Sequence, residues 1–199
     1  MKVAIILKAP ELNCSVEEKY IIYADAGYKY KERFADKTVL GVVGDFDSLK
    51  FVPECEKIVS LEVEKNYTDG ERSVLYAKEC GAKEIVIYGA FGGKMEHVLG
   101  NLALLKIAQN LNLLAKIKDG EVVAELIEGK KTIRVKKGCT VSLIPYGGDC
   151  EFKESKNLYY PLNELTLTPA DTRGISNLAQ SEEIFLHIKK GQALIFYSI

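Results

Sequence analysis

Two aspartates separated by a single residue stand out in the stretch GVVGDFDSL, residues 41–49. Asp45 and Asp47 follow an apolar run, at the point where a buried strand would end. Residues two apart on an extended chain face the same side, so the two carboxylates converge. They repel each other unless a cation lies between them, and Mg²⁺ accepts carboxylate oxygens together with water and substrate phosphates. The pair therefore indicates a magnesium site that faces a phosphate-bearing substrate.

Two more aspartates occupy similar positions. Asp25 follows the apolar run IIYA, and Asp69 opens a predicted helix. Ligands of open α/β sheets bind beyond the carboxyl ends of the strands, where these residues would lie. Structural roles stay open: Asp25 could be a turn residue before Gly27, and Asp69 could favour the positive end of its helix. Asp45 and Asp47 could also serve an Asx-turn and a helix cap.

A glycine-rich stretch between a strand and a helix is the second candidate for chemistry. It reads YGAFGGKMEHVLGN, residues 88–101. Gly92 and Gly93 would let backbone N–H groups approach phosphates near a helix N-terminus, and Lys94 adds a positive charge. His97 and Asn101 are four residues apart and share one helix face. The stretch matches neither a dinucleotide fingerprint nor a Walker loop, so a simple turn and a structural histidine remain alternatives.

The elements that position these residues alternate between strand and helix over the first part of the chain. We expect strands at residues 3–7, 20–24, 39–43, 57–61, 84–88 and 113–117, and helices at 68–79 and 95–110. The helix at 68–79 begins with TDGE, a capping-box pattern. Continuous apolar strands separated by helices predict a mostly parallel, Rossmann-like α/β sheet covered on both faces. We assign this α/β domain to residues 1–120.

The rest of the chain has a different pattern. Short stretches with two-residue alternation follow one another, separated by Gly, Pro or Asn: VVAELIEG, KTIRVKKG, TVSLIPYGG, NELTLTPA, EEIFLHIKKG and QALIFYSI. This spacing predicts an all-β sandwich without helices at residues 121–199. The boundary between the two domains is expected near residues 119–124.

Composition excludes several classes of protein. The net charge of −1 gives no basic field for nucleic acid. The five cysteines form no C-x-x-C pair, which favours reduced thiols in a cytosolic protein. The opening MKVAIILKAP is too short for a signal peptide, and no apolar run approaches the ~20 residues of a membrane-spanning helix. The sequence therefore predicts a soluble, cytoplasmic protein that binds neither nucleic acid nor membrane.

The order of the motifs resembles that of thiamine pyrophosphokinases, also called thiamine diphosphokinases. YADAG, GDFDS, KNYTD, GAFGGKMEH followed by Asn101, SLIP and TRGISN occur in that family's order and spacing over nearly the whole chain. The resemblance implies an α/β catalytic domain, a β-sandwich domain and a homodimer. It also implies transfer of a pyrophosphoryl group from ATP, with Mg²⁺, to the hydroxyethyl oxygen of thiamine, giving thiamine diphosphate and AMP.

The resemblance implies a role for each matched residue. The metal ligands and catalytic residues would be Asp45, Asp47 and Asp69. The nucleotide-binding residues would be Asp25, Gly92, Gly93, Lys94, His97 and Asn101. The thiamine-binding residues would be Arg173, Ser176 and Asn177, in a pocket to which both subunits contribute.

The chain departs from the family pattern at several positions. Asn66 stands where a carboxylate is usual, Lys94 and Glu96 replace the usual Arg and Asp, and Ala26 replaces a Gly. The chain has no Trp, and the family's aromatic stacking on thiamine would fall to another ring. Tyr159, Tyr160 and Tyr197 are candidates, although each could equally be sandwich core.

These departures leave two alternatives open. The first is a pyrophosphokinase for another hydroxymethyl heterocycle, such as a pterin. The second is a weakly catalytic module that binds thiamine or a nucleotide.

Overall fold

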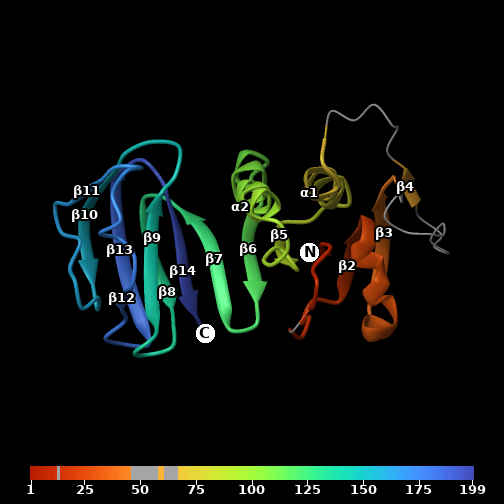
Figure 1. The fold of residues 1–199 in the computed structure, drawn as a ribbon, viewed down its shortest axis with the longest axis horizontal. Coiled ribbons are helices and arrows are strands. Elements are labelled where there is room, and N and C mark those ends of the chain that lie inside the picture. Colours follow the sequence, from red (N-terminus) through yellow and green to blue (C-terminus); the bar gives the residue numbers. More distant parts are fainter. Residues whose placement is uncertain (13, 46–57, 61–66) are drawn as a thin grey trace. The chain divides into compact units, whose positions relative to one another are not determined.

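The computed structural model describes residues 1–12, 14–45, 58–60 and 67–199, so the predictions for Asp47 and Asn66 lie outside the described residues. The chain divides into two compact units, Met1–Gly120 and Glu121–Ile199 (Figure 1). Each unit has its own hydrophobic core and is described by itself.

A parallel sheet forms the centre of the first unit. Its described strands are β1 (Lys2–Ile6), β2 (Tyr20–Ala24), β3 (Thr38–Gly44), β4 (Ile58–Ser60), β5 (Glu84–Tyr88) and β6 (Leu114–Asp119). They lie in the order β6-β5-β1-β2-β3-β4, and every neighbouring pair is parallel. The predicted α/β class is confirmed. All carboxyl ends of these strands therefore share one edge, to which the candidate residues belong.

Two helices pack against this sheet. Helix α1 (Asp69–Glu79) contacts β1, β2 and β3, and α2 (Met95–Asn110) contacts α1 and β6 (Figure 1). The backbone N–H of Glu71 donates to the Thr68 hydroxyl over 3.2 Å, so Thr68 is the N-cap that the TDGE pattern predicts. Ser73 donates to the Asp69 carbonyl over 2.7 Å and fixes the first turn further.

The other face of the sheet is covered by irregular backbone. A 3₁₀ helix, η1 (Asp25–Phe34), follows β2 directly, an element that the sequence pattern does not predict. Its Tyr28 and Phe34 join Leu12, Cys14 and Val16 of the β1–β2 connection in one buried cluster with the strands. Arg33 donates to the Leu12 and Cys14 carbonyls and holds the connection in place. Both sheet faces are thus buried, as predicted, although α-helices cover only one of them.

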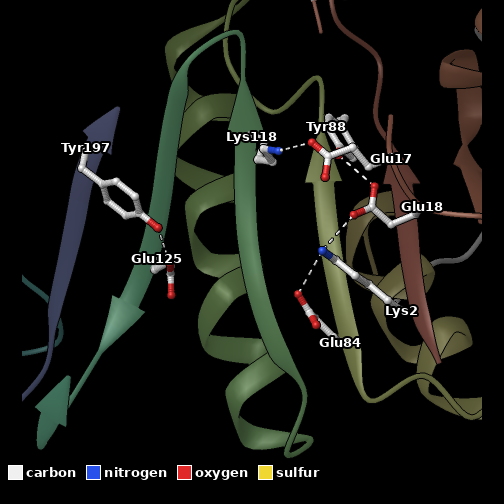
Figure 2. Close-up of polar contacts among 8 residues, drawn as sticks. All are labelled: Lys2, Glu17, Glu18, Glu84, Tyr88, Lys118, Glu125 and Tyr197. Carbon is white, nitrogen blue, oxygen red and sulfur yellow. Dashed lines mark hydrogen bonds and ion pairs between the residues drawn. The ribbon is translucent and has the colours of Figure 1, made fainter. Parts of the chain in front are cut away.

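A buried carboxylate anchors this cover to the sheet. Tyr88, the last residue of β5, donates to the Glu18 carboxylate over 2.8 Å, and Lys2 pairs with Glu18 at 3.2 Å and with Glu84 at 3.3 Å (Figure 2). Burial, and next the hydrogen bond to Glu18, hold the pKa of Tyr88 well above its usual range. The ion pair with Lys2 compensates the buried charge, which would otherwise be costly.

The second unit is a β-sandwich, as predicted, and none of its residues is helical. Its strands are β7 (Val122–Ile127), β8 (Lys130–Arg134), β9 (Thr140–Pro145), β10 (Cys150–Lys156), β11 (Thr166–Leu167), β12 (Asn177–Leu178), β13 (Glu183–Lys190) and β14 (Ala193–Ser198). One layer has the order β12-β9-β14-β7 and the other β11-β10-β13-β8, and all these pairs are antiparallel. Apolar side chains from both layers fill one core.

Two strands of the sandwich, β10 and β12, are absent from the sequence prediction. The β10 sequence CEFKESK is rich in charge, and its pairing with β13 shifts register on both sides of Phe152. Such an irregularity breaks the two-residue alternation that identifies a strand. Strand β12 has only two residues, which is too short to show a pattern.

In the described part of the chain, no helix is long and apolar enough to cross a membrane. The described cysteines Cys14, Cys80, Cys139 and Cys150 are free thiols, as predicted.

Candidate active site

Asp25 is a buried carboxylate at the carboxyl edge of the sheet. It follows β2 directly and opens η1, with a left-handed backbone (φ 43°) and 6% of its surface exposed. Its Oδ1 is buried and has no hydrogen-bond partner. Both the left-handed backbone and the unpaired oxygen are costly, and such features concentrate at functional sites. These features make Asp25 a candidate for binding a ligand.

Asp45 lies beside Asp25 because the two strands that carry them are neighbours. Ala24 of β2 pairs with Val43 of β3, which places Asp25 opposite Gly44. A Cβ at Gly44 would lie 3.1 Å from the Cα of Asp25, so only glycine permits this close approach without a shift. Asp45 comes next in the chain and is half-buried. The structure thus brings Asp25 and Asp45 to the same point of the edge.

Asp69 reaches this edge on the first turn of α1. The helix start packs near β1, since a Cβ at Gly70 would lie 3.7 Å from the Leu7 Cδ2 atom and 3.1 Å from Leu104 of α2. Asp69 is half-buried there. The capping bond of Thr68 fixes the helix start and hence the position of the aspartate.

The glycine loop after β5 packs on the same region. Gly92 and Gly93 have left-handed backbones, with φ of 86° and 77°, which explains the residue type at both positions. A Cβ at Gly89 would lie 2.8 Å from the Leu7 carbonyl oxygen, so the loop begins in close contact with the end of β1. The loop is therefore held at the carboxyl edge, where its backbone can face a ligand.

Asn101 holds this loop from α2. Its Nδ2 donates to the Ala90 carbonyl over 2.8 Å. Lys94 is the N-cap residue of α2 and, like His97, is exposed. His97 and Asn101 thus differ although they share one helix face. The His97 ring is exposed, whereas the Asn101 amide supports the loop.

The fit of a metal ion depends on the aspartates. Within the described residues, no three His, Cys, Asp or Glu side chains lie close enough together to hold a metal, and Asp47 is outside that part. The unpaired Oδ1 of Asp25 beside Asp45 is the donor chemistry that a hard divalent cation takes. The described carboxylates at this edge thus offer oxygen donors of the kind that a divalent cation takes, but they do not form a metal group of three side chains by themselves.

In the second unit, Asn177 is a buried amide with three hydrogen bonds. Only 2% of its surface is exposed. Its Oδ1 accepts from the N–H groups of Tyr160 and Leu178, both at 2.9 Å, and its Nδ2 donates to the Tyr160 carbonyl over 2.7 Å. In this structure the amide holds the backbone of Tyr160.

Arg173 and Ser176 precede Asn177 in the chain, and both are exposed. Ser176 has a left-handed backbone (φ 61°), and its N–H donates to the Ser142 hydroxyl over 3.1 Å. Arg173 donates through Nε to Asp171 over 3.0 Å. Asp171 also accepts from the N–H and hydroxyl of Thr168, and these bonds, the backbone one first, lower its pKa to about 2.

The three tyrosines named as candidates for stacking differ in exposure. Tyr197 is core: 4% of its surface is exposed, and its hydroxyl donates to Glu125 (Figure 2). Burial, followed by the nearby Glu125 carboxylate, holds its pKa well above the usual range. Tyr159 and Tyr160 are 57% and 60% exposed and form an edge-to-face pair with ring centroids 4.8 Å apart. Of the three tyrosines, Tyr159 and Tyr160 therefore remain the candidates for stacking on thiamine.

Comparisons with known proteins match both units. The family model described as "Thiamin pyrophosphokinase, catalytic domain" matches residues 13–115, and that described as "Thiamin pyrophosphokinase, vitamin B1 binding domain" matches residues 129–193. The thiamine pyrophosphokinase of Bacillus subtilis is 29% identical over 150 residues. That alignment covers 67% of this chain and 66% of the relative, just under two thirds of its length.

Solved structures with the same fold cover the entire chain. The crystal structure of the Bacillus subtilis thiamine pyrophosphokinase has a TM-score of 0.86 at 23% identity, with 100% of this chain and 99% of that one covered. The Geobacillus thermodenitrificans thiamin pyrophosphokinase gives 0.82 at 24% identity, with 100% and 98% covered. The Candida albicans thiamin pyrophosphokinase gives 0.81 at 15% identity, with 100% and 88% covered.

Proposed function

We infer that this chain, which belongs to the thiamin pyrophosphokinase family, transfers a pyrophosphoryl group from ATP to the hydroxyethyl group of thiamine. The products would be thiamine diphosphate and AMP. The family model for the catalytic domain covers more than half of the chain, and the model for the vitamin-binding domain covers most of the remainder.

The observation that carries this proposal is the unpaired carboxylate oxygen of Asp25 beside Asp45. A buried carboxylate oxygen without a partner is costly, so a site that keeps one is suited to receive a cation or a hydrogen-bond donor. Asp45, Asp47 and Asp69 would hold Mg²⁺ together with Asp25. When bound, the ion would offset charge on the phosphates and on the leaving AMP.

The other residues of this edge would bind and orient the triphosphate. The backbone N–H groups around Gly92 and Gly93 would face the phosphates at the start of α2, where the helix dipole also favours anions. Lys94 would add charge, His97 would line the nucleotide side, and Asn101 would keep the loop in place through Ala90. Such positioning supplies most of the catalysis in phosphoryl transfer.

The transfer would be an in-line displacement. The hydroxyl oxygen of thiamine forms a bond to the β-phosphorus of ATP, and the bond from this phosphorus to the oxygen bridging to the α-phosphorus breaks. AMP leaves with that bridging oxygen. The hydroxyl proton passes to a nearby carboxylate, for which Asp69 is the proposed acceptor.

The second unit would bind thiamine through a region that includes Arg173, Ser176 and Asn177. There Asn177 holds the segment of Tyr160. Tyr159 and Tyr160 offer exposed rings that can take up the positively charged thiazolium. A homodimer in the cytoplasm is part of the proposal, and light scattering after gel filtration would test the mass.

One assay tests the reaction. The protein is incubated with ATP, Mg²⁺ and thiamine, and the nucleotides are separated, with a matched reaction that omits thiamine. Thiamine-dependent AMP is the expected product. ADP in place of AMP would identify transfer of a single phosphoryl group and would overturn the proposal, as would AMP formed with a hydroxymethyl pterin but not with thiamine.

A further inference from the structure

The connection after β1, residues 7–10, lies at the point where the strand order of the sheet reverses. The chain passes from β1 to β2 on one side, while β5 is followed by β6 on the other, and β1 and β5 are neighbours. Open α/β sheets bind their ligands at such a point, in the crevice between the two diverging connections. Residues 7–10 and the glycine loop form these two connections.

The two connections are packed tightly against each other. The N–H of Leu7 donates to the Tyr88 carbonyl over 2.9 Å, which continues the β1–β5 pairing by one residue. A Cβ at Gly89 would lie 3.2 Å from the Ala9 Cβ, and one at Gly92 would lie 3.3 Å from the Pro10 Cδ. The glycine loop thus contacts Leu7, Ala9 and Pro10.

Helix η1 holds the same connection from the other side. Lys29 donates to the Ala9 carbonyl over 2.7 Å, and the Tyr30 hydroxyl donates to it over 3.1 Å. Because β1 lies between β5 and β2 in the sheet, residues 7–10 lie between the glycine loop and Asp25, which follows β2. The hydrogen bonds from η1 and the contacts with the glycine loop fix their backbone.

Within this fixed connection, Lys8 is exposed while its neighbours Leu7 and Ala9 are buried. It adds a positive charge to an edge where Asp25, Asp45 and Asp69 are negative. An ammonium group on a flexible stem suits phosphate binding, since it donates in any of three directions. We propose that Lys8 binds the triphosphate of ATP from the β1 side of the crevice, opposite the glycine loop. This inference rests on the proposed function, since it assigns a residue to the same nucleotide site.

Binding measurements with nucleotides that cannot react test this inference without any turnover. The probes are α,β-methylene ATP and AMP, each titrated with Mg²⁺ into the full chain by calorimetry. The variants are Lys8→Met, which keeps the stem and removes the charge, and Lys8→Arg, which keeps a charge. Lys83→Met is the matched control, because Lys83 is exposed directly before β5, at the opposite edge of the sheet.

We expect Lys8→Met to weaken binding of the triphosphate analogue about ten-fold and that of AMP less than about two-fold, since the lost contact is with the outer phosphates. Lys8→Arg should stay within about three-fold of the wild type, and Lys83→Met should match it. Unchanged binding of the analogue by Lys8→Met, or equal weakening of AMP, would overturn the inference.

The inference and the proposed reaction can fail separately. A wild-type protein that binds the analogue but forms no AMP with thiamine would overturn the reaction and leave Lys8 to be judged by the titrations. A wild-type protein that forms AMP, with unchanged binding in Lys8→Met, would overturn only the role of Lys8. A wild-type protein that does not bind the analogue would overturn both.

Discussion

Asp25 and Asn177 are both buried polar side chains that the sequence predicts to bind a substrate, but they differ in the hydrogen bonds that their polar atoms make. Asp25 has a carboxylate oxygen without a partner, whereas Asn177 makes three hydrogen bonds to backbone groups. A side chain whose polar atoms are engaged by the protein stabilises the fold, and one with an unpaired buried atom costs stability until a ligand arrives. The comparison distinguishes a residue that we propose to bind a ligand, Asp25, from one that holds the backbone, Asn177.

The largest effect that would test this comparison is on turnover. Asp25→Asn keeps the shape and tolerates the left-handed backbone, but removes the charge that would face the cation. Thiamine-dependent AMP formation should fall by about 100-fold or more, because the variant loses transition-state stabilisation through the metal.

The stability of this variant provides the contrast. Thermal unfolding of Asp25→Asn should occur at the wild-type temperature or above, since the buried side chain that keeps an unpaired oxygen is no longer charged, and Mg²⁺ with ATP should no longer raise this temperature. Full activity in Asp25→Asn would end the assignment of Asp25 to the cation site.

Asn177 should behave in the opposite way. Asn177→Ala leaves the N–H and carbonyl of Tyr160 and the N–H of Leu178 without their partner. We expect the free energy of unfolding to drop by about 2–3 kcal/mol, because three part-buried backbone groups lose their hydrogen-bond partner at once. Urea unfolding measures the change.

A matched control is Asn163→Ala, in which an exposed amide loses its bond from the Ser155 N–H. It should cost about 1 kcal/mol or less. Equal losses in the two variants would mean that burial of the Asn177 amide has no special weight, and the comparison with Asp25 would lose its basis.

Asn101 is intermediate, because its single bond to the Ala90 carbonyl supports a loop and not a core. Asn101→Ala should raise the KM for ATP about five-fold and leave the KM for thiamine unchanged, since about 1 kcal/mol of loop support is lost. Asn101→Asp should give the same result, because a carboxylate cannot donate to Ala90. Steady-state kinetics with Lys106→Ala, on the same helix, is the reference; equal changes in both KM values would point to general loosening.

The smallest effect concerns Asp171, a carboxylate that is fully engaged at the surface. Its pKa of about 2 lies below the usual 3.8 because the folded state stabilises the charged form. The stabilisation is therefore present above about pH 4 and is lost as the pH falls toward about 2. NMR titration should place the Asp171 midpoint near 2, and Asp171→Asn should flatten unfolding stability over this window. A midpoint near 3.8 would show that the bonds to Thr168 and Arg173 do not persist in solution.

Regular elements with a clear period could be predicted from the sequence. Strands β2 and β5 and helix α2 have the predicted bounds, since apolar runs and an apolar helix end at recognisable residues. The 3₁₀ helix η1 could not, because its buried Tyr28 and Phe34 are six residues apart, which places them on one face of a 3₁₀ helix but not of an α-helix.

The position of the candidate site could be predicted from the sequence, but the hydrogen bonding of each side chain could not. That Asp25, Asp45, Asp69 and the glycine loop share one edge follows from parallel strands. The unpaired oxygen of Asp25 depends on packing around it, and the use of the Asn177 amide depends on Tyr160, which is 17 residues away in the chain. Lys8 gave no signal, because a lysine after a strand has no distinctive pattern.

Gly27 is a position near the site that cannot accept a side chain, which an inspection of polar contacts would not show. A Cβ at this position would lie 2.2 Å from the Ile6 carbonyl oxygen, which is backbone and cannot rotate aside. Any other residue would push η1 off β1, and Asp25, two residues earlier, would move with it. In a library with every amino acid at position 27, selection for the reaction would retain glycine. A residue without a side chain thus fixes the position of Asp25 at the edge of the sheet.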